Sequence, residues 1–323
     1  MNMNNFIAVN ENTEEILGKL VYYSVSNVLI DKVKFCEIGT QLGLTKVKPA
    51  RESASDAFRN ATGAIYERTV LKSIGQTRII RVYCRDNKRE DNDRIYRELV
   101  KETLGSSTNE YTKLANIYLD KKGEYVDYEN VLYDSDVDTY KHCDRAVELF
   151  GLFQTCYGRS HVDTVIEALL EQMSATPISI HGKLYFVPKS HLHLVDILED
   201  YIKEINDYNQ NDTEMIANSI YLVDDEKQRD KMTREFYSDY KKNIEFYQGQ
   251  IQRFLDNGCD SQKVIDRWML KVETLQQKKA LYEDVLKQEL TDLDEEFGVL
   301  EMQAQELRYK AKNNANFQMT FAA

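Results

Sequence analysis

The last third of the chain contains two long amphipathic stretches without proline, at about residues 225–257 and 261–312. In the second stretch apolar residues recur at steps of three and four, which is the pattern of a helix face that packs along a neighbouring helix. Between the stretches lie Asn257 and Gly258, which both tolerate a positive φ and therefore end helices well. The sequence predicts a long antiparallel helical hairpin of the coiled-coil type.

The two predicted helices differ in length. At about 1.5 Å of rise per residue, the first spans roughly 50 Å and the second roughly 78 Å. With the turn centred near Cys259, Asp225 lies opposite Leu293, so the apolar positions beyond Leu293 have no partner on the first helix. Because an apolar stripe in water is unfavourable, we expect these positions to pack on the globular part of the chain, for instance on residues 191–207, or on a second subunit or a partner protein. The candidate protein-interaction residues are Leu290, Leu293, Phe297, Leu300 and Leu307.

Two irregularities interrupt the apolar seam of the second helix. Lys279 occupies a position where an apolar side chain is expected, and two successive steps of four residues surround Leu286. A departure of this kind from heptad spacing predicts a local relaxation of the supercoil.

Charge and cysteine usage limit the class of protein. Acidic residues outnumber basic ones, 54 against 42, and the net charge of −12 repels nucleic acids and anionic membranes from the molecule as a whole. No apolar run approaches the ~18 residues that a membrane helix needs, and the N-terminus lacks the pattern of a signal peptide. The five cysteines are scattered and show no metal or redox spacing, as expected for free thiols in a reducing compartment. The sequence therefore predicts a cytoplasmic protein with no membrane contact.

Turn signals and alternating apolar residues predict short helices and β-hairpins in the rest of the chain. Helices are expected at residues 12–23, 29–43, 53–61 and 136–173, the last with a break at 157–160, and from Ser190 onward. Hairpins are expected at residues 66–85, 110–132 and 178–187, the last turning at His181-Gly182, and a strand at 215–223; residues 94–104 fit either a helix or a strand.

The order helix, helix, hairpin across residues 138–187 is that of a winged-helix module. In its DNA-binding form the second helix carries basic residues. Residues 161–173 contain Asp163, Glu167 and Glu171 but no lysine or arginine, which argues against DNA reading and leaves protein contacts open.

These elements predict an α+β fold, with a mixed body of β-hairpins and a possible winged-helix-like module, and a long C-terminal antiparallel helical hairpin. The expected domains are residues 1–135, an N-terminal α+β domain; 136–224, a helical, winged-helix-like domain; and 225–323, the helical-hairpin arm and tail.

The chain shows no motif of a known catalytic or cofactor site. There is no glycine-rich phosphate loop and no nucleophile elbow. The acidic run that begins at Asp134 imitates a calcium loop, but Thr139 replaces the required glycine and Arg145 the closing glutamate. An acidic cap on the following helix explains this run better. We therefore assign no catalytic, cofactor-binding or metal-binding residues and expect no enzymatic activity.

Residues 46–85 form a basic island, with nine cationic residues against three acidic ones. In the predicted strand, Arg81, Tyr83 and Arg85 alternate onto one face, which places cations beside an aromatic ring and suits phosphate groups. Alternatively, this face is ion-paired with the acidic arm of the same or another molecule. The candidate contact residues for nucleic acid or an acidic partner are Lys72, Arg78, Arg81, Tyr83 and Arg85.

Three tracts carry a family resemblance, namely residues 57–59, 97–102 and 182–188, the last followed by a helix and a charged C-terminal helical region. Over most of residues 50–225 the chain resembles an uncharacterised family of bacteriophage and mobile-element proteins, with a mixed α/β body and a C-terminal coiled coil. The resemblance implies such an origin, and thus the cytoplasm of a host cell, and supplies no catalytic residues.

Together these observations predict a non-enzymatic protein-interaction protein that needs no cofactor. It self-assembles into a homo-oligomer or binds a host protein complex through its coiled-coil arm, for example as an inhibitor of antiphage defence. The alternative is a protein that binds single-stranded nucleic acid or a phosphate backbone through the basic island, residues 46–85.

Overall fold

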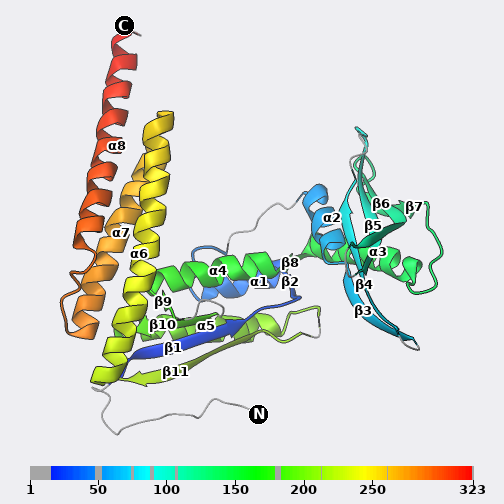
Figure 1. The fold of residues 1–323 in the computed structure, drawn as a ribbon, viewed down its shortest axis with the longest axis horizontal. Coiled ribbons are helices and arrows are strands. Elements are labelled where there is room, and N and C mark those ends of the chain that lie inside the picture. Colours follow the sequence, from blue (N-terminus) through cyan, green and yellow to red (C-terminus); the bar gives the residue numbers. More distant parts are fainter. Residues whose placement is uncertain are drawn as a thin grey trace. The chain divides into compact units, whose positions relative to one another are not determined.

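The computed structural model describes residues 16–47, 53–73, 76–87, 91–105, 108–178, 183–211, 213–259 and 261–321. The fold is α+β, as the sequence predicts, with several antiparallel sheets (Figure 1). The chain forms two compact units. Unit 1 comprises residues up to Ser24, Ile166–Lys203 and the chain from Met215 onward; unit 2 comprises Val25–Val165 and Glu204–Glu214. This division differs from the three consecutive domains expected from the sequence.

Unit 1 contains a four-stranded antiparallel sheet with the order β11-β1-β10-β9. Its strands are β1 (Ile16–Ser24), β9 (Thr176–Pro177), β10 (Leu184–Pro188) and β11 (Ile216–Val223). The helix expected at residues 12–23 is wrong for the described residues 16–23, which form the central strand β1. In β1 the buried Lys19, Val21 and Tyr23 alternate with the partly exposed Leu20 and Tyr22, which is the period of a strand and not of a helix. Gly18 fits this place because an added Cβ would lie 2.1 Å from the backbone oxygen of Val187.

The C-terminal helices of unit 1, α6 (Glu226–Asn257), α7 (Gln262–Leu286) and α8 (Asp294–Phe321), form the arm. The predicted antiparallel register of the first two helices is confirmed. Phe236 of α6 stacks on Tyr282 of α7 with ring centroids 4.6 Å apart, and Asp239 pairs with Lys278 at 2.8 Å. Gly258 ends α6 in the left-handed conformation, with a φ of 67°.

The second predicted helix is not continuous, because α7 ends at Leu286 and Lys287 caps it with a φ of 56°. The chain then reverses, and α8 runs alongside α6 in the same direction (Figure 1). Gln248 of α6 donates a hydrogen bond to the backbone oxygen of Glu296, and Gln303 donates to Gln252 further along. The arm is therefore a bundle of three helices.

The distal seam is buried inside this bundle, with α6 and α7 as its neighbours. Its buried residues are Leu290, Leu293, Phe297, Leu300, Ala304, Leu307 and Ala311. The expectation that these positions outrun their intramolecular partner is wrong. They pack on α6 and α7 and not on residues 191–207, because the reversal after α7 returns them to the arm.

The arm shares its core with the sheet of unit 1. Leu17, Phe186 and Leu222 of the strands belong to the same apolar cluster as the arm residues. Tyr282 donates its hydroxyl to the backbone oxygen of Ser174, and Lys278 donates to that of Ala175. The arm is thus anchored to its own unit by apolar packing and by hydrogen bonds.

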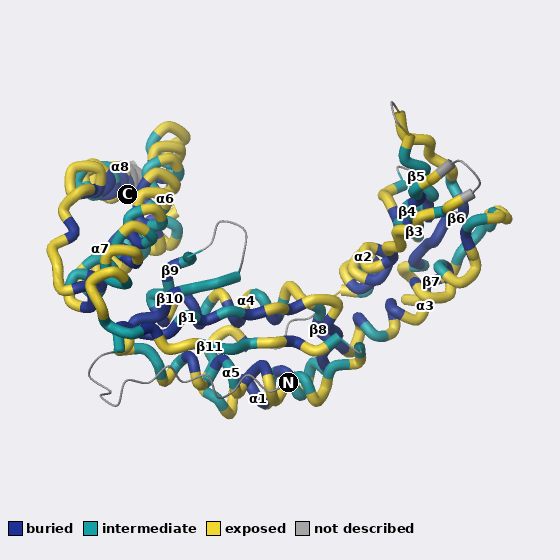
Figure 2. Tube along the Cα trace, turned by 60° about the horizontal axis from the view of Figure 1, so that its bottom comes forward, coloured by how far each residue is buried: buried dark blue, intermediate teal, exposed yellow. Residues whose placement is uncertain are grey.

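Unit 2 is built on a five-stranded antiparallel meander with the order β3-β4-β5-β6-β7. The strands are β3 (Tyr66–Ser73), β4 (Gln76–Asp86), β5 (Arg94–Leu104), β6 (Glu110–Asp120) and β7 (Tyr125–Glu129). The two hairpins predicted in this region are confirmed, and residues 94–104 form a strand. Helices α2 (Ala54–Gly63) and α3 (Thr139–Thr155) cover one face through residues such as Phe58 and Phe150. Buried residues concentrate in the middle strands, especially β6 (Figure 2).

The remaining elements of unit 2 are α1 (Lys32–Gln41) and the short pair β2 (Leu29–Asp31) and β8 (Cys156–Gly158). Helices α4 (Arg159–Gln172) and α5 (Leu192–Asn206) contain two of the four points at which the chain passes between the units; the other two follow Ser24 and Glu214. Helix α5 follows η2 (Lys189–His191), as expected from Ser190.

The described residues of 138–187 do not form the winged-helix module suggested by the sequence. Helix α3 belongs to unit 2, whereas β9 and β10 belong to unit 1, where β10 pairs with β1 as well as with β9. The predicted order of helices and strands is therefore correct, but β9 and β10 belong to the four-stranded sheet of unit 1. The proposed turn at His181-Gly182 lies outside the described residues.

All five cysteines are unpaired, in agreement with the sequence. Within the described ranges, every helix is too short or too polar to cross a bilayer.

Candidate functional site

The face of the five-stranded sheet opposite α2 and α3 has no described helix packed on it. We call this surface the open face. Its residues on β3 and β4 are Tyr66, Arg68, Val70, Lys72, Arg81, Tyr83 and Arg85, and those on β5 and β6 are Glu98, Val100, Glu102, Tyr111 and Lys113.

Strand alternation explains how the sequence builds this face. Ile80, Val82 and Cys84 of β4 point into the core, so the residues between them, including Arg81 and Tyr83, point away from it. The predicted alternation of Arg81, Tyr83 and Arg85 is confirmed. Lys72 lies on the same face, whereas Arg78 is paired with Leu71 and lies on the other one.

Two glutamates of β5 neutralise the cations of β4. Arg81 lies 3.8 Å from Glu102, and Arg85 lies 3.0 Å from Glu98. Lys113 of β6 also donates to Glu98, at 3.0 Å. The acids that balance this part of the basic island therefore come from the adjacent strand of the same sheet.

The electrostatics of the face follow from these pairs. Burial alone would raise the pKa of Glu98, but hydrogen bonds from Lys113 and Arg85 hold it below its ordinary value. Burial, followed by the nearby charge of Glu102, raises the pKa of Tyr83, so this phenol stays protonated and able to donate a hydrogen bond. The centre of the open face is thus a fixed network of ion pairs and phenols.

The exposed part of the open face, which we call the rim, is different. On the edge strand β3, Tyr66 is 61% exposed and Val70 is 45% exposed. Tyr111, which is 53% exposed, lies on β6 and is separated from β3 by β4 and β5. Arg68 and Lys72 are exposed, and within the described part of the chain neither has an ion-pair partner. The rim therefore combines aromatic and apolar surface with cations that are not neutralised.

The contact residues predicted from the sequence do not include Tyr66, Arg68, Tyr111 or Lys113, although Arg68 belongs to the basic island. A signal was present for the first two, because Tyr66, Arg68, Val70 and Lys72 occupy every second position of a predicted strand. Tyr111 and Lys113 join the face only through the pairing of β6 with β5, which the sequence does not show.

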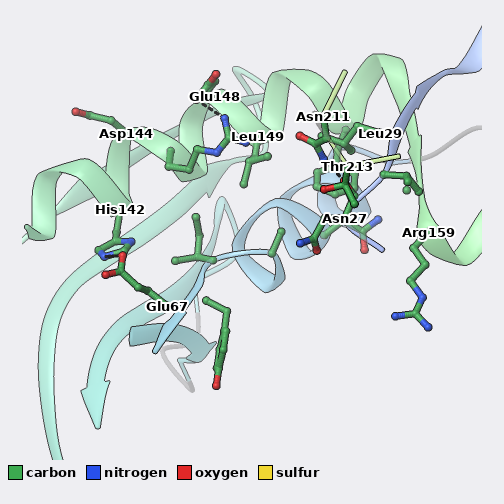
Figure 3. Close-up of a pocket in the computed structure, with 18 of the residues that line it drawn as sticks. Asn27, Leu29, Glu67, His142, Asp144, Glu148, Leu149, Arg159, Asn211 and Thr213 are labelled. Atoms are coloured by element: carbon green, nitrogen blue, oxygen red, sulfur yellow. Dashed lines mark hydrogen bonds and ion pairs between the residues drawn. The ribbon is translucent and has the colours of Figure 1, made fainter. Parts of the chain in front are cut away.

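A second candidate is a broad cavity of unit 2 with a volume of about 1170 Å³ (Figure 3). His142 and Glu67 lie at one end, and Asn27, Asn211 and Thr213 lie at the other. The His142 Nε2 atom is 3.5 Å from Glu67, and burial lowers the pKa of His142 despite the opposing effect of that carboxylate.

Several other charged groups of the cavity are held by partners inside or outside it. Arg145 binds Glu148 at 2.6 Å, and Asp144 accepts a hydrogen bond of 2.7 Å from Tyr128. No three potential metal ligands cluster anywhere in the described ranges. Few polar groups are left to converge on a ligand, so the open face is the stronger candidate.

The acidic run at Asp134 has a structural role. Lys101 donates to both Asp134 and Asp136, and Asp138 caps the first turn of α3. A side chain of the protein itself supplies the positive charge there, which agrees with the rejection of a calcium loop.

The predicted interaction residues of the arm, Leu290, Leu293, Phe297, Leu300 and Leu307, are at most 9% exposed and do not form a surface. In the comparison with known proteins, a model of a family of unknown function (DUF6744) matches residues 16–313. The searches of curated proteins and of solved structures returned no match.

Proposed function

We propose that this chain, which belongs to the family of unknown function DUF6744, is a non-enzymatic protein-interaction protein that binds an acidic partner protein through the open face. The interaction surface is then the sheet of unit 2 and not the apolar seam of the arm, because that seam is buried. The proposal requires no cofactor.

The observation that carries the proposal is the exposed row of Tyr66, Arg68, Val70 and Lys72 on the edge strand β3. Tyr66 and Val70, together with Tyr111 on β6, offer aromatic and apolar contact area, and tyrosine and arginine are among the residues enriched at protein interfaces. Arg68 and Lys72 supply the excess positive charge. A partner with an acidic surface complements this rim, both in charge and in the apolar area that it can cover.

Single-stranded nucleic acid is the alternative occupant, and two observations favour a protein over it. Arg81, Arg85 and Lys113 are already held by glutamates, which leaves few cations for phosphates. The guanidinium of Arg85 also lies 6.0 Å from the ring centroid of Tyr111, where a base would stack. The net charge of −12 also disfavours the binding of nucleic acid.

The narrower form of the proposal rests on the resemblance to bacteriophage and mobile-element proteins. In that form the partner is a host protein complex in the cytoplasm, and binding inhibits an antiphage defence.

The test compares three full-length baits in affinity capture from a lysate of the organism that encodes the chain. The baits are the unchanged protein, the variant Arg68→Glu/Lys72→Glu, and the control Lys141→Glu/Arg145→Glu, which makes the same charge change on α3. We expect a captured protein that resists nuclease treatment, persists with the control and falls at least fivefold with the variant. Capture of nucleic acid that depends on Arg68 and Lys72 would replace the proposal by its alternative. If the three baits capture the same material, the open face is not the binding surface.

A further inference from the structure

The arm has a second apolar stripe, on the outer side of α8. Val299, Met302 and Tyr309 are 44%, 64% and 67% exposed. At about 100° per residue, the three side chains fall within roughly 80° of one another around the helix. They lie on the side opposite to Leu300, Ala304 and Leu307, which pack into the bundle. We call Val299, Met302 and Tyr309 the outer stripe.

A glycine beside the outer stripe points to a neighbouring helix. Gly298 lies inside α8, where glycine is less favourable than alanine by about 0.5–1 kcal/mol. An added Cβ at this position would meet no atom of the described chain within 4 Å. Packing inside the described chain gives no reason for glycine here, as it gives none at Gly249 of α6; beside the outer stripe, the missing side chain lets another helix approach closely.

The charges at the two ends of the outer stripe are opposite in sign. Glu295 lies at its N-terminal end and Lys310 at its C-terminal end, on the same side of the helix. Two copies of α8 in parallel would bring Glu295 next to Glu295 of the second copy. In an antiparallel arrangement, Glu295 of one copy lies near Lys310 of the other copy, and Val299 of one copy lies near Tyr309 of the other. Within one copy, Lys310 pairs with Glu306. Both side chains are half exposed, so this pair contributes little stability and does not prevent Lys310 from pairing with Glu295 of the second copy.

Helix α8 is longer than the part that lies alongside α6. Gln303 lies beside Gln252, so Asn257, the last residue of α6, lies near residue 308 of α8. Helix α8 continues to Phe321, and its C-terminal end extends beyond the end of α6 (Figure 1).

We propose that the chain self-associates through α8, with the outer stripes of two copies packed antiparallel about a two-fold axis. An isologous contact of this kind closes after two subunits and gives a dimer. The exposed apolar residues are few, so the dimer dissociates in the micromolar range, about 10⁻⁶ M or weaker.

The test is sedimentation velocity of the full chain from about 1 to 100 μM, a range that brackets the dissociation constant expected for a contact of this size. The unchanged protein is expected to shift from 37.7 kDa towards twice that mass as its concentration rises. Met302→Glu should weaken the association at least tenfold. Leu270→Glu, at an exposed leucine of α7, is the matched control and should leave it unchanged. Circular dichroism establishes that each variant is folded.

A charge exchange tests the antiparallel arrangement. Glu295→Lys and Lys310→Glu should each weaken the dimer, and the two changes together should restore it. A monomer at every concentration would overturn the proposal, as would a dimer that Met302→Glu does not weaken. A dimer weakened by Met302→Glu but not restored by the double exchange would overturn the antiparallel arrangement.

Discussion

Lys279 of α7 donates a hydrogen bond to Asp294, the first residue of α8. In the sequence, Lys279 interrupts an apolar seam; in the structure it binds the helix that folds back beside it. Glu283, one turn further along α7, also lies within 3.5 Å of its ammonium group. Hydrogen bonds and charges from these two carboxylates outweigh burial and raise the pKa of Lys279, so the amine stays charged.

The coupling between Lys279 and Asp294 can be measured by a double-mutant cycle. We expect Lys279→Ala and Asp294→Asn to lower the free energy of unfolding, with a coupling of about 0.5–1 kcal/mol because Asp294 is half exposed. Urea denaturation of the four proteins gives the value. Lys279→Ala with Glu295→Gln, in the same helical turn, is the control pair and should show no coupling. A coupling of zero between Lys279 and Asp294 would contradict the contact.

The hydroxyl of Tyr282 anchors the arm to the sheet of unit 1. This side chain is fully buried, and its hydroxyl donates a hydrogen bond of 3.0 Å to the backbone oxygen of Ser174. Tyr282→Phe leaves that oxygen without this donor, and we expect a loss of about 1–2 kcal/mol in the free energy of unfolding. Urea denaturation measures the loss, and Tyr309→Phe, at an exposed tyrosine, serves as the control. Equal stabilities of the two variants would show that the Tyr282 bond contributes nothing.

His142 predicts a pH dependence of the stability of unit 2. Burial lowers the pKa of His142 below its ordinary value of 6.5, so the folded protein binds fewer protons than the unfolded chain just below pH 6.5. Stability therefore rises with pH in that window and is lost as pH falls through it. His142→Asn should flatten this part of the profile in urea denaturation between pH 5 and 7.

The carboxylate of Glu67 supplies a direct check on the same histidine. Glu67 raises the pKa of His142 against the effect of burial, so Glu67→Gln should lower it further. Titration of the His142 ring protons by NMR distinguishes the two proteins. A pKa of His142 that rises in Glu67→Gln would contradict the contact at 3.5 Å.

Oligothymidylate tests the alternative occupant of the open face. The exposed rim offers Arg68 and Lys72 as cations without partners in the described ranges, so at most about two phosphates can be neutralised there. We expect a labelled 20-mer to show no saturable binding in fluorescence anisotropy at 150 mM NaCl. Saturable binding at that salt, lost in Arg68→Ala/Lys72→Ala, would favour nucleic acid over an acidic protein.

The sequence predicts most elements of this fold but not how they assemble. The hairpin of β3 and β4, the cap of α2 at Ser53 and the end of α6 at Gly258 all follow from local signals, because turns and caps depend on neighbouring residues. Strand β1 is mistaken for a helix because its environment is set by β10 and β11, which lie far away in the sequence. Pairing over such distances cannot be seen in local patterns.

The same distinction holds for the candidate sites. Alternation in β4 correctly groups Arg81, Tyr83 and Arg85, but their glutamate partners lie on β5 and become neighbours only through the register of the sheet. In the arm, the spacing of apolar residues changes near Leu286, and the sequence predicts a relaxed supercoil there and not the end of a helix. The steps of four around Leu286 lie where α7 ends.

Relative to alanine, a glycine at the turn between α7 and α8 is expected to change the free energy of unfolding in opposite directions if α7 ends at Leu286 and if it continues through residue 287. Lys287 caps α7 with a φ of 56°, which costs a residue other than glycine roughly 1 kcal/mol. Lys287→Gly relieves this strain but loses the ion pair with Asp224, a carboxylate that is 6% exposed and that keeps Arg229 as a partner. Lys287→Ala loses the same ion pair, so we expect Lys287→Gly to be more stable than Lys287→Ala by about 1 kcal/mol. In a continuous helix, the same glycine would lie in the interior and cost about 1 kcal/mol. Urea denaturation gives the sign, and Lys287→Ala, which loses the ion pair without relieving the strain, should be no more stable than the unchanged protein. Destabilisation by glycine, together with stabilisation by alanine, would mean that α7 continues through residue 287 and that the seam beyond Leu290 needs another partner.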